Sequence, residues 1–467
     1  MPKMFILVSP LKLINFLIMS EKIIIKKTIN SFNKSIQIEG DKSLSIRWAL
    51  LASQATGISK AKNILKSEDI LSSLNCLKKL GVKIKLKKKI CEIHGAGING
   101  FLYKKNTTLN VGNSGTLGRL ILGLLVHSKK RIKIIGDKSL SKRDFIRVIK
   151  PLEKFGAKFK SNNGKLPIII KGTSNPQNII YEEKRGSAQC KSAVMLAALN
   201  TFGQTKIKAK RSRNHTEIFF KFLKIPIKVK KKSTFDLITV RNVKKINSFN
   251  YRIPSDISSS AFFLVLTVLS NNSKLTVKNV NINSTRTGVI KILKMMGAKI
   301  KFKNLKIYNG EKIADIYVSS SKNLKSINCP TSFNTSAIDE FLIIFLVAAK
   351  AKGVSYFRNL SELNQKESPR LKWGSKILNL MGVKTKTTND SIKIYGNPNL
   401  KVDKNIIIKN FLKDHRVFMT SVIAALVFGG KWTIHDKDSI KTSFPSFLNI
   451  INDIKKEIII SSLVNKI

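Results

Sequence analysis

The stretch Leu80-Gly81-Val82-Lys83-Ile84-Lys85 joins the end of an apolar helix, a glycine stop and a strand in which apolar residues alternate with lysines. The same pattern returns as FGAKFK at 155–160, IPIKVK at 225–230, MGAKIK at 296–301 and MGVKTK at 381–386. A glycine at such a stop suits the left-handed backbone that often ends a helix. The alternation predicts a strand with one buried and one solvated face. This recurrence indicates a chain built from repeated helix and strand units.

The repeats define the expected architecture. Their stops recur roughly every 70 to 85 residues, and residues 447–454 match the helical part of a sixth unit. A unit of this size holds about two helices and several strands, which is more than a solenoid repeat contains. We therefore predict an α+β fold of two similar lobes with three units each.

The expected lobes are assembled from separate parts of the chain. Two stretches, residues 33–40 and 240–256, are the candidates for the passages between the lobes. We assign residues 41–250 to the first lobe and residues 21–40 together with 251–467 to the second. Residues 1–20 form an extension whose role the sequence leaves open. Pro10 and Lys12 interrupt its apolar residues, so no apolar run in it is long enough to span a bilayer.

The composition narrows the possible functions. The 467 residues include 86 Lys and Arg against 27 Asp and Glu, a formal net charge of +59. Because the lysines are spread along the whole chain and only 7% of residues are aromatic, we expect no specific nucleic-acid binding. The four cysteines, Cys76, Cys91, Cys190 and Cys329, lack metal-ligand or disulfide spacing. We expect no metal, no cofactor, no membrane segment and a cytoplasmic location.

Several segments of the first half combine small or hydroxyl residues with a cation at the start of a predicted helix. They are GDKSLSIR at 40–47, GNSGTLGR at 112–119 and GSAQCKSA at 186–193. Backbone N–H groups and the positive end of a helix attract anions, so the first two segments are candidate anion sites. The third, with its hydroxyls and amide, suits the hydroxyls of a small polar ligand. Each segment taken alone also fits an ordinary helix cap or turn. We expect the helix after the first segment to begin near Trp48, and Arg143 and Arg147 to share one face of a later helix.

The second half adds charged pairs before predicted helices, at Asp339-Glu340, residues 366–370 and residues 414–416. Arginine usage supports a shared role for all these segments. Lysine is the usual cation of this chain, yet arginine persists inside the segments. A planar guanidinium binds carboxylate or phosphate through two parallel bonds, which an ammonium cannot do. Arg47, Arg119, Arg370 and Arg416 lie within these segments, and Arg143, Arg147, Arg213 and Arg286 lie in further polar clusters at 136–147, 212–217 and 284–288. The pattern favours small, anionic, rigidly held ligands.

In their order along the chain, these segments resemble the family of 5-enolpyruvylshikimate-3-phosphate (EPSP) synthases. The resemblance runs from about Ile36 to Pro445 and includes GDKSLSIR, GNSGTLGR, SLSKRDFIRV, GSAQCKSA, SRNHTE, PSDISSSAFF, STRTG, IDE, KESPR and DHR. It implies two lobes of three βαβαββ units with inward helices, an inside-out α/β barrel. It also implies transfer of the enolpyruvyl group of phosphoenolpyruvate to the 5-hydroxyl of shikimate-3-phosphate, with release of phosphate, in chorismate and aromatic amino acid biosynthesis.

The resemblance also implies residue roles. Asp339 would be the base at the hydroxyl, Glu367 the proton donor at the methylene and Lys42 a second acid. The implied shikimate-3-phosphate ligands are Lys42, Ser43, Arg47, Ser187, Ala188, Gln189, Ser212, Asp339 and Lys366. The implied phosphoenolpyruvate ligands are Lys42, Asn113, Gly115, Arg143, Gln189, Arg370 and Arg416. We expect the protein to act as a monomer.

The sequence departs from the family at a few positions. Pro369 stands where the family usually has Asp, and Asp144 where it usually has Pro. Many members have a lysine at the place of Thr442, so Lys441, one residue away, is a candidate replacement. Two other functions stay open. One is UDP-N-acetylglucosamine enolpyruvyl transferase, which uses a loop cysteine that none of the cysteines here matches. The other is a basic nucleic-acid-binding protein.

Overall fold

The computed structural model describes residues 21–464, with side chains described as far as residue 455. The glycine stops adopt the left-handed conformation that the repeat predicts. The φ angles are 88° at Gly81, 101° at Gly156, 92° at Gly297 and 85° at Gly382. In the repeat at 225–230, Lys224 takes this conformation instead, with φ 55°. Each stop ends one helix and leads directly into a strand.

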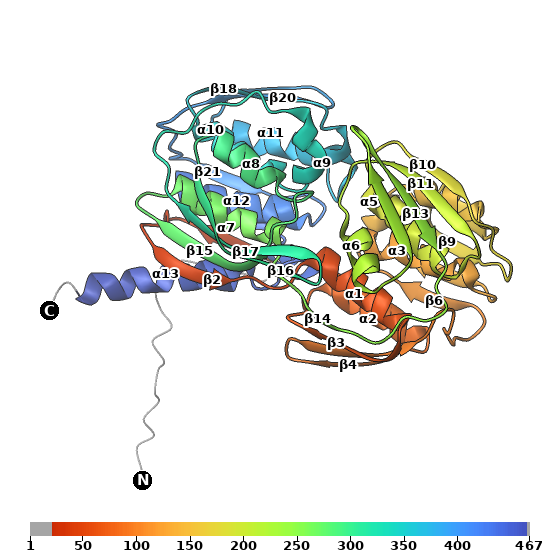
Figure 1. The fold of residues 1–467 in the computed structure, drawn as a ribbon. Helices are drawn as coiled ribbons and strands as arrows, with labels where there is room; N and C mark the ends of the chain where they lie inside the picture. Colours follow the sequence, from red (N-terminus) through yellow and green to blue (C-terminus); the bar gives the residue numbers. More distant parts are fainter. Residues whose placement is uncertain (1–20, 465–467) are drawn as a thin grey trace, which may run out of the picture.

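The first lobe, on the right in Figure 1, holds three four-stranded sheets. Its strands are β3 (Thr56–Lys62), β4 (Lys83–Lys87), β5 (Ile90–Ala96) and β14 (Asn250–Arg252); β6 (Thr107–Asn110), β7 (Ile132–Ile135), β8 (Lys158–Asn162) and β9 (Lys165–Lys171); β10 (Ile180–Glu183), β11 (Gln204–Lys210), β12 (Ile227–Lys231) and β13 (Phe235–Arg241). Its helices are α1 (Lys42–Ser53), α2 (Glu68–Lys79), α3 (Gly115–Leu124), α4 (Ile146–Glu153), α5 (Ala188–Ala197) and α6 (His215–Phe222).

The second lobe repeats this plan with one four-stranded and two three-stranded sheets among the residues described. Its strands are β2 (Asn33–Gln37), β15 (Lys274–Asn281), β16 (Lys299–Tyr308) and β17 (Glu311–Ser319); β18 (Gly353–Phe357), β19 (Thr385–Thr387) and β20 (Ile392–Gly396); β1 (Lys22–Ile25), β21 (Asn405–Ile408) and β22 (Lys431–His435). Its helices are α7 (Ile257–Leu269), α8 (Gly288–Met295), α9 (Asn334–Ala337), α10 (Phe341–Lys350), α11 (Arg370–Leu380), α12 (His415–Phe428) and α13 (Phe447–Val464).

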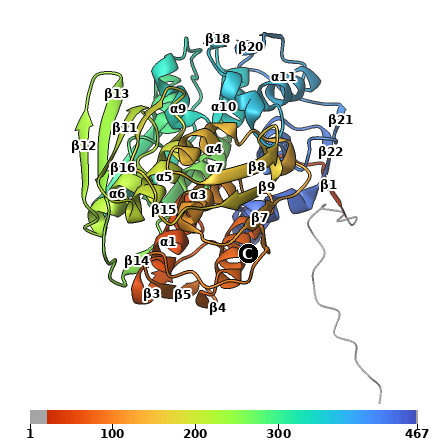
Figure 2. The same cartoon turned by 90° about the vertical axis from the view of Figure 1, so that its right-hand side faces the viewer.

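One unit shows how the repeat closes. Strand β6 pairs in parallel with β7, and β9 then pairs antiparallel with both β7 and β8, which gives the order βαβαββ. The first helices of the units pack together inside each lobe, α3 against α1 and α5, and α7 against α10 and α12. The sheets lie outside these helices (Figure 2). The outer strand faces are exposed, as the lysine alternation predicts, so the inside-out architecture is confirmed.

The two passages between the lobes lie side by side. In Figure 1, red strand β2 lies beside β15 in the second lobe, although it precedes the whole first lobe. The chain then passes through Gly40 and Asp41, and it returns through residues 253–256 after β14 has paired with β3. Gly40 and Ser255 form an isolated bridge, and Asp41 N donates to Pro254 O at 2.8 Å. Two hydrophobic cores result, one from Leu44 to Ile253 and the other from the rest.

Three expectations about helices need correction. Helix α1 begins at Lys42, where a start near Trp48 is predicted, because the Asp41 carboxylate accepts from Leu44 N at 2.8 Å and caps the first turn. Arg143 ends a short 3₁₀ turn ahead of α4, so it does not share a helical face with Arg147. Helix α13 runs on from Phe447 to Val464, beyond the eight residues predicted.

Candidate active site

Residues of the candidate segments lie at the start of one helix after another. Lys42 opens α1, Ser187 caps α5, and Asp414 caps α12. Some of these residues are ordinary helix caps, the alternative to a ligand site that the sequence left open. Ser187 Oγ accepts from Cys190 N at 3.3 Å, and Asp414 Oδ1 from Arg416 N at 2.9 Å. Capping fixes the helix starts, and the neighbouring cations are thereby held beside their positive ends.

Asp339 lies at the centre of a group of cations from both lobes. Lys366 Nζ is 3.3 Å from Oδ1 and Arg370 Nη1 3.4 Å, whereas Arg213 Nη2 from the first lobe is 2.5 Å from Oδ2. Arg416 donates to the Asp339 carbonyl at 2.5 Å. Burial raises the pKa of Asp339, but the charges of Lys366, Arg213, Arg416 and Arg370 outweigh it and hold the pKa well below the ordinary value. Asp339 is therefore an ionised carboxylate in the ligand-free protein.

Glu367 is a second carboxylate held by cations of both lobes. Arg370 Nη2 donates to it, and Arg143 Nη1 of the first lobe lies 3.5 Å from Oε1. Burial opposes ionisation, but the charges of Arg370, Arg143 and Lys42 keep the pKa of Glu367 well below its ordinary value. Cations that a bound anion would require are thus paired with two acids of the protein.

Lys42 lies on the first-lobe side of this group. Its Nζ is 3.0 Å from Asp69 Oδ2, and its backbone N–H donates to Asp256 Oδ2 at 3.2 Å. Burial raises the pKa of Asp69 against the opposing charge of Lys42. The sequence analysis did not single out Asp69, because an acid in the first turn of a helix is a common capping feature.

The glycine turn of α3 places an amide and an arginine together. Asn113 Oδ1 accepts from Arg143 Nη2 at 2.9 Å, and its Nδ2 donates to Asp137 Oδ2 at 2.5 Å. A Cβ added at Gly115 would lie 2.9 Å from Arg119 Nη1 and 3.2 Å from Arg143 Nη1. Gly115 therefore leaves room for both guanidinium groups.

Arg119 links the glycine turn of α3 to the segments around it. Its Nη1 donates to Gln189 Oε1 at 2.8 Å and to Gly115 O at 3.3 Å, and its Nη2 donates to Asp144 O at 3.0 Å. Asp144 Oδ1 in turn accepts from Ile146 N at 2.6 Å. The residue that replaces the family's proline thus accepts the backbone N–H of the first residue of α4.

The remaining residues of the expected shikimate-3-phosphate set lie along the first-lobe wall. Arg47 is only 4% exposed. Its guanidinium donates hydrogen bonds to Thr216 at 2.9 Å, Ser192 at 3.2 Å and the Ser43 carbonyl at 3.1 Å. Burial lowers the pKa of Arg47 to about 10. Ser187 and Ala188 open α5, and Gln189 Nε2 donates to Thr116 Oγ1 at 3.0 Å.

The C-terminal segment corrects one candidate. Lys441 Nζ forms an ion pair with Asp438 at 2.9 Å, and its side chain is 55% exposed, so Lys441 does not join the site. Thr442 lies closer, with Oγ1 3.3 Å from His415 Nδ1. The His415 ring is buried and its Nε2 has no hydrogen-bond partner among the residues described. Burial, with the charge of Lys42, holds the pKa of His415 well below its ordinary value, so the ring is neutral.

Arg213, Asp69 and His415 were not expected to contact a ligand. Arg213 and His415 stand in candidate motifs, but spacing alone gives no reason to prefer them to Ser212 and Arg416. Arg213 meets Asp339 only because one lobe packs against the other, whereas His415 and Glu367 both belong to the second lobe.

Solved structures of other proteins share this two-lobed architecture. The fold matches EPSP synthase from Acinetobacter baumannii with a TM-score of 0.81 and 34% identity, over 93% of this chain and 98% of the other. It also matches the enolpyruvyl transferase NikO from Streptomyces tendae with a TM-score of 0.73 at 12% identity, a likeness of fold alone. The two-lobed fold, with charged helix starts facing one another, is therefore that of the enolpyruvyl transferases.

Sequence likeness identifies the branch of that class. The model of the family EPSP synthase (3-phosphoshikimate 1-carboxyvinyltransferase) matches residues 26–451. The 3-phosphoshikimate 1-carboxyvinyltransferase of Ruthia magnifica subsp. Calyptogena magnifica is 41% identical over 95% of this chain and 99% of its own length. That of Vesicomyosocius okutanii is 39% identical over 91% and 96%. The chain belongs to the EPSP synthase family. None of its described helices is both long and apolar enough to cross a membrane.

Proposed function

We propose that Asp339, Glu367 and Lys42 carry out the family's reaction in this chain, in the shikimate pathway that leads to aromatic amino acids. In that reaction the 5-hydroxyl of shikimate-3-phosphate adds to C2 of phosphoenolpyruvate while the methylene carbon gains a proton. The tetrahedral intermediate then loses a proton from the new methyl group and expels phosphate. The chemistry requires a base at the hydroxyl, an acid at the methylene, and cations for two phosphates and two carboxylates.

The observation that carries the proposal is the pairing of both acids with cations from opposite lobes. Arg213 and Arg143 belong to the first lobe, and their partners Asp339 and Glu367 to the second. Anionic substrates that enter between the lobes would compete for these cations. As the cations turn to the ligands, the pKa values of Asp339 and Glu367 would rise towards the range where they can exchange protons.

The two acids then differ in role. Asp339 lies beside Lys366 and Arg213, so we assign it to the hydroxyl of shikimate-3-phosphate. The first lobe would bind the same substrate through Ser43, Arg47, Ser187, Ala188, Gln189 and Ser212. Glu367 lies between Arg143 and Arg370, which we assign with Arg416, Asn113 and Gly115 to phosphoenolpyruvate. Lys42, beside Asp69, would contact both ligands and share proton transfer with Glu367.

The other enolpyruvyl transfer reaction has less support. Its acid is a loop cysteine, whereas the four cysteines here are all buried. Burial raises the pKa of Cys76 and Cys91 to about 12 and that of Cys329 to about 11. Thiols held in this way are poor proton donors at neutral pH.

The test is release of phosphate from phosphoenolpyruvate, with shikimate-3-phosphate and UDP-N-acetylglucosamine offered separately. We expect release with shikimate-3-phosphate alone, and its absence in the Asp339→Asn variant. Release only with the sugar nucleotide would contradict the acceptor. We further propose a cytoplasmic monomer, because one chain supplies both carboxylates and their cations; elution at twice the chain mass in gel filtration would contradict the monomer.

A further inference from the structure

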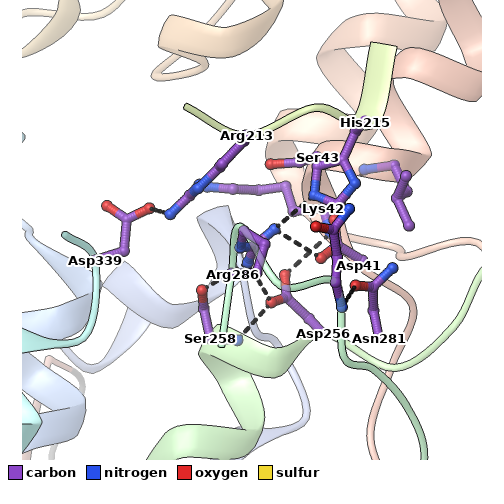
Figure 3. Close-up of polar contacts among 12 residues, drawn as sticks. Asp41, Lys42, Ser43, Arg213, His215, Asp256, Ser258, Asn281, Arg286 and Asp339 are labelled. Carbon is purple, nitrogen blue, oxygen red and sulfur yellow. Dashed lines mark hydrogen bonds and ion pairs between the residues drawn. The ribbon is translucent and has the colours of Figure 1, made fainter. Parts of the chain in front are cut away.

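Beneath the substrate site, where the chain passes between the lobes, lies a second group of charges that the proposed mechanism does not use. Its centre is Arg286, which is 2% exposed and lies between α1 and α7 (Figure 3). Arg286 Nη1 is 3.1 Å from Asp41 Oδ2, and Nη2 is 3.1 Å from Asp256 Oδ1. Asp41 and Asp256 belong to the two passages, so a single guanidinium joins both.

The contacts of Arg286 lead to Lys42 in one direction. Asp41 caps α1 through Leu44 N at 2.8 Å, and Asp256 accepts from the Lys42 backbone N–H at 3.2 Å. Both carboxylates therefore bind Arg286 and the first turn of α1 at once. The position of Lys42 depends on where Arg286 holds them.

The contacts lead to Asp339 in the other direction. Arg286 Nη2 donates to Ser258 Oγ at 2.7 Å, and Ser258 Oγ donates to Glu340 Oε1. Glu340 is 1% exposed and directly follows Asp339 in the chain. The loop that carries Asp339 is thus joined to the same guanidinium as Lys42.

His215 and Glu311 hold Arg286 from the far side. Arg286 Nη1 is 3.3 Å from His215 Nε2, and His215 Nδ1 is 2.6 Å from Glu311 Oε1. Because a guanidinium has only donors, Nε2 must accept, so the ring proton lies on Nδ1 and is donated to Glu311. Glu311 Oε2 accepts from Asn281 and Asn283, each at 3.1 Å. The carboxylate of Glu311 selects the tautomer that Arg286 requires.

We propose that Arg286 is a positioning residue, held by Glu311 through His215, that fixes Lys42 and Asp339 relative to each other across the two lobes. The inference rests on the catalytic roles proposed above. It assigns no substrate contact to Arg286, which touches only protein groups. A lysine at position 286 would keep the charge but could not bridge two carboxylates and a hydroxyl with a planar fork.

The test compares Arg286→Lys and Glu311→Gln with matched exposed controls, Arg131→Lys and Glu153→Gln. For each variant, kcat and both KM values are measured per folded molecule, with the folded fraction taken from circular dichroism. We expect kcat to fall about 10- to 100-fold in Arg286→Lys, the usual range when a supporting hydrogen-bond partner is lost, while both KM values stay within about threefold. Glu311→Gln should show the same split at about tenfold. The controls should match the parent.

Imidazole ¹⁵N spectra give a second measurement that a merely structural role would not change. The chain has five histidines, so the His215 signal can be assigned by its loss in His215→Gln. We expect a protonated Nδ1 in the parent and a shift towards the other tautomer in Glu311→Gln, because the amide brings donors towards Nδ1. His215→Gln, which can still donate and accept, should retain more activity than His215→Phe.

The possible outcomes separate the two proposals. An active parent with full kcat per folded molecule in both Arg286→Lys and Glu311→Gln overturns this inference and leaves the proposed function in place. A loss confined to KM would also overturn it. An inactive parent would overturn the proposed function and this inference with it. If Arg286→Lys does not fold, Glu311→Gln and the tautomer decide the question.

Discussion

The protein has two groups of charged residues that differ in how they are balanced. Around Asp339 and Glu367, cations of both lobes surround two acids that keep about 15% of their side chains exposed. Around Arg286, by contrast, one cation lies between two carboxylates, and nothing in the group is more than slightly exposed. On the proposals above, the first group exchanges its partners for an anionic ligand, whereas the second fixes the geometry of the lobes.

The largest effect is expected from Asp339→Asn, which removes the central acid of the exchangeable group. Turnover should fall about 100-fold or more, the usual loss when a general base is removed. Binding of both substrates should stay within about tenfold, since Lys366, Arg213 and Arg416 remain. Steady-state kinetics with each substrate varied in turn measures both quantities. Equal loss of binding and turnover would show that Asp339 only positions the ligand.

Glu367→Gln tests the same group through stability. The folded-state pKa of Glu367 is depressed, so its ionised form stabilises the fold above the unfolded pKa, and the contribution is lost as the pH falls through the folded value. We expect the free energy of unfolding of the variant to be lower by about 1.5 to 3 kcal/mol at pH 7, the contribution of a hydrogen bond to a charged group. The difference should persist at pH 5 and shrink below about pH 4. Urea unfolding across this range measures it; a gap that widens on acidification would contradict the assignment.

Gly115→Ala should have a smaller effect, confined to one substrate. The added methyl group would approach Arg119 Nη1 and Arg143 Nη1, so both guanidinium groups must shift. We expect KM for phosphoenolpyruvate to rise about tenfold, a loss near 1.4 kcal/mol, with KM for shikimate-3-phosphate nearly unchanged. Gly382→Ala, away from the site, shows the effect of backbone strain alone: its Cβ would meet nothing within 4 Å, but its φ of 85° disfavours any side chain, so stability should fall while both KM values stay unchanged. Equal rises in both KM values would argue against a phosphoenolpyruvate site at Gly115.

The smallest effect concerns the residue that precedes Arg370 at the start of α11. Pro369 opens α11 without a side-chain hydrogen bond, where the family usually has aspartate. Pro369→Asp should add a capping acceptor and raise the free energy of unfolding by about 1 kcal/mol, with turnover within twofold. Urea unfolding and the phosphate-release assay measure the two quantities. An unchanged stability would show that this backbone does not allow the cap.

Much of the fold could be predicted from local patterns. Gly81, Gly156, Gly297 and Gly382 take the left-handed conformation at the predicted stops, because a helix end and its capping glycine are neighbours in sequence. The start of α1 was placed too late, because the prediction followed the apolar pattern from Trp48 onward. The capping residue Asp41, which is also a local signal, marks the true start. The roles of the candidate site residues stay predictions until they are measured.

The pairing of residues across the lobes could not be predicted from spacing. Arg213 and Asp339 stand 126 residues apart, and Arg286 and Asp41 stand 245 apart. At such separations, the packing of two lobes decides which cation meets which acid. Lys441 was a candidate because it stands one residue from the place where many family members have a lysine, but its side chain forms an ion pair with Asp438.

The sequence by itself determined the repeat, the inward helices, the lysine-bearing outer strand faces and the family, because each depends on residues close together or on an ordered series of short motifs. Only the tertiary structure decided that Asp339 and Glu367 are ionised among cations of both lobes, and that Arg286 joins the two passages of the chain. Electrostatic interactions depend on distance and burial. For these residues both quantities arise only when the separately formed lobes come together.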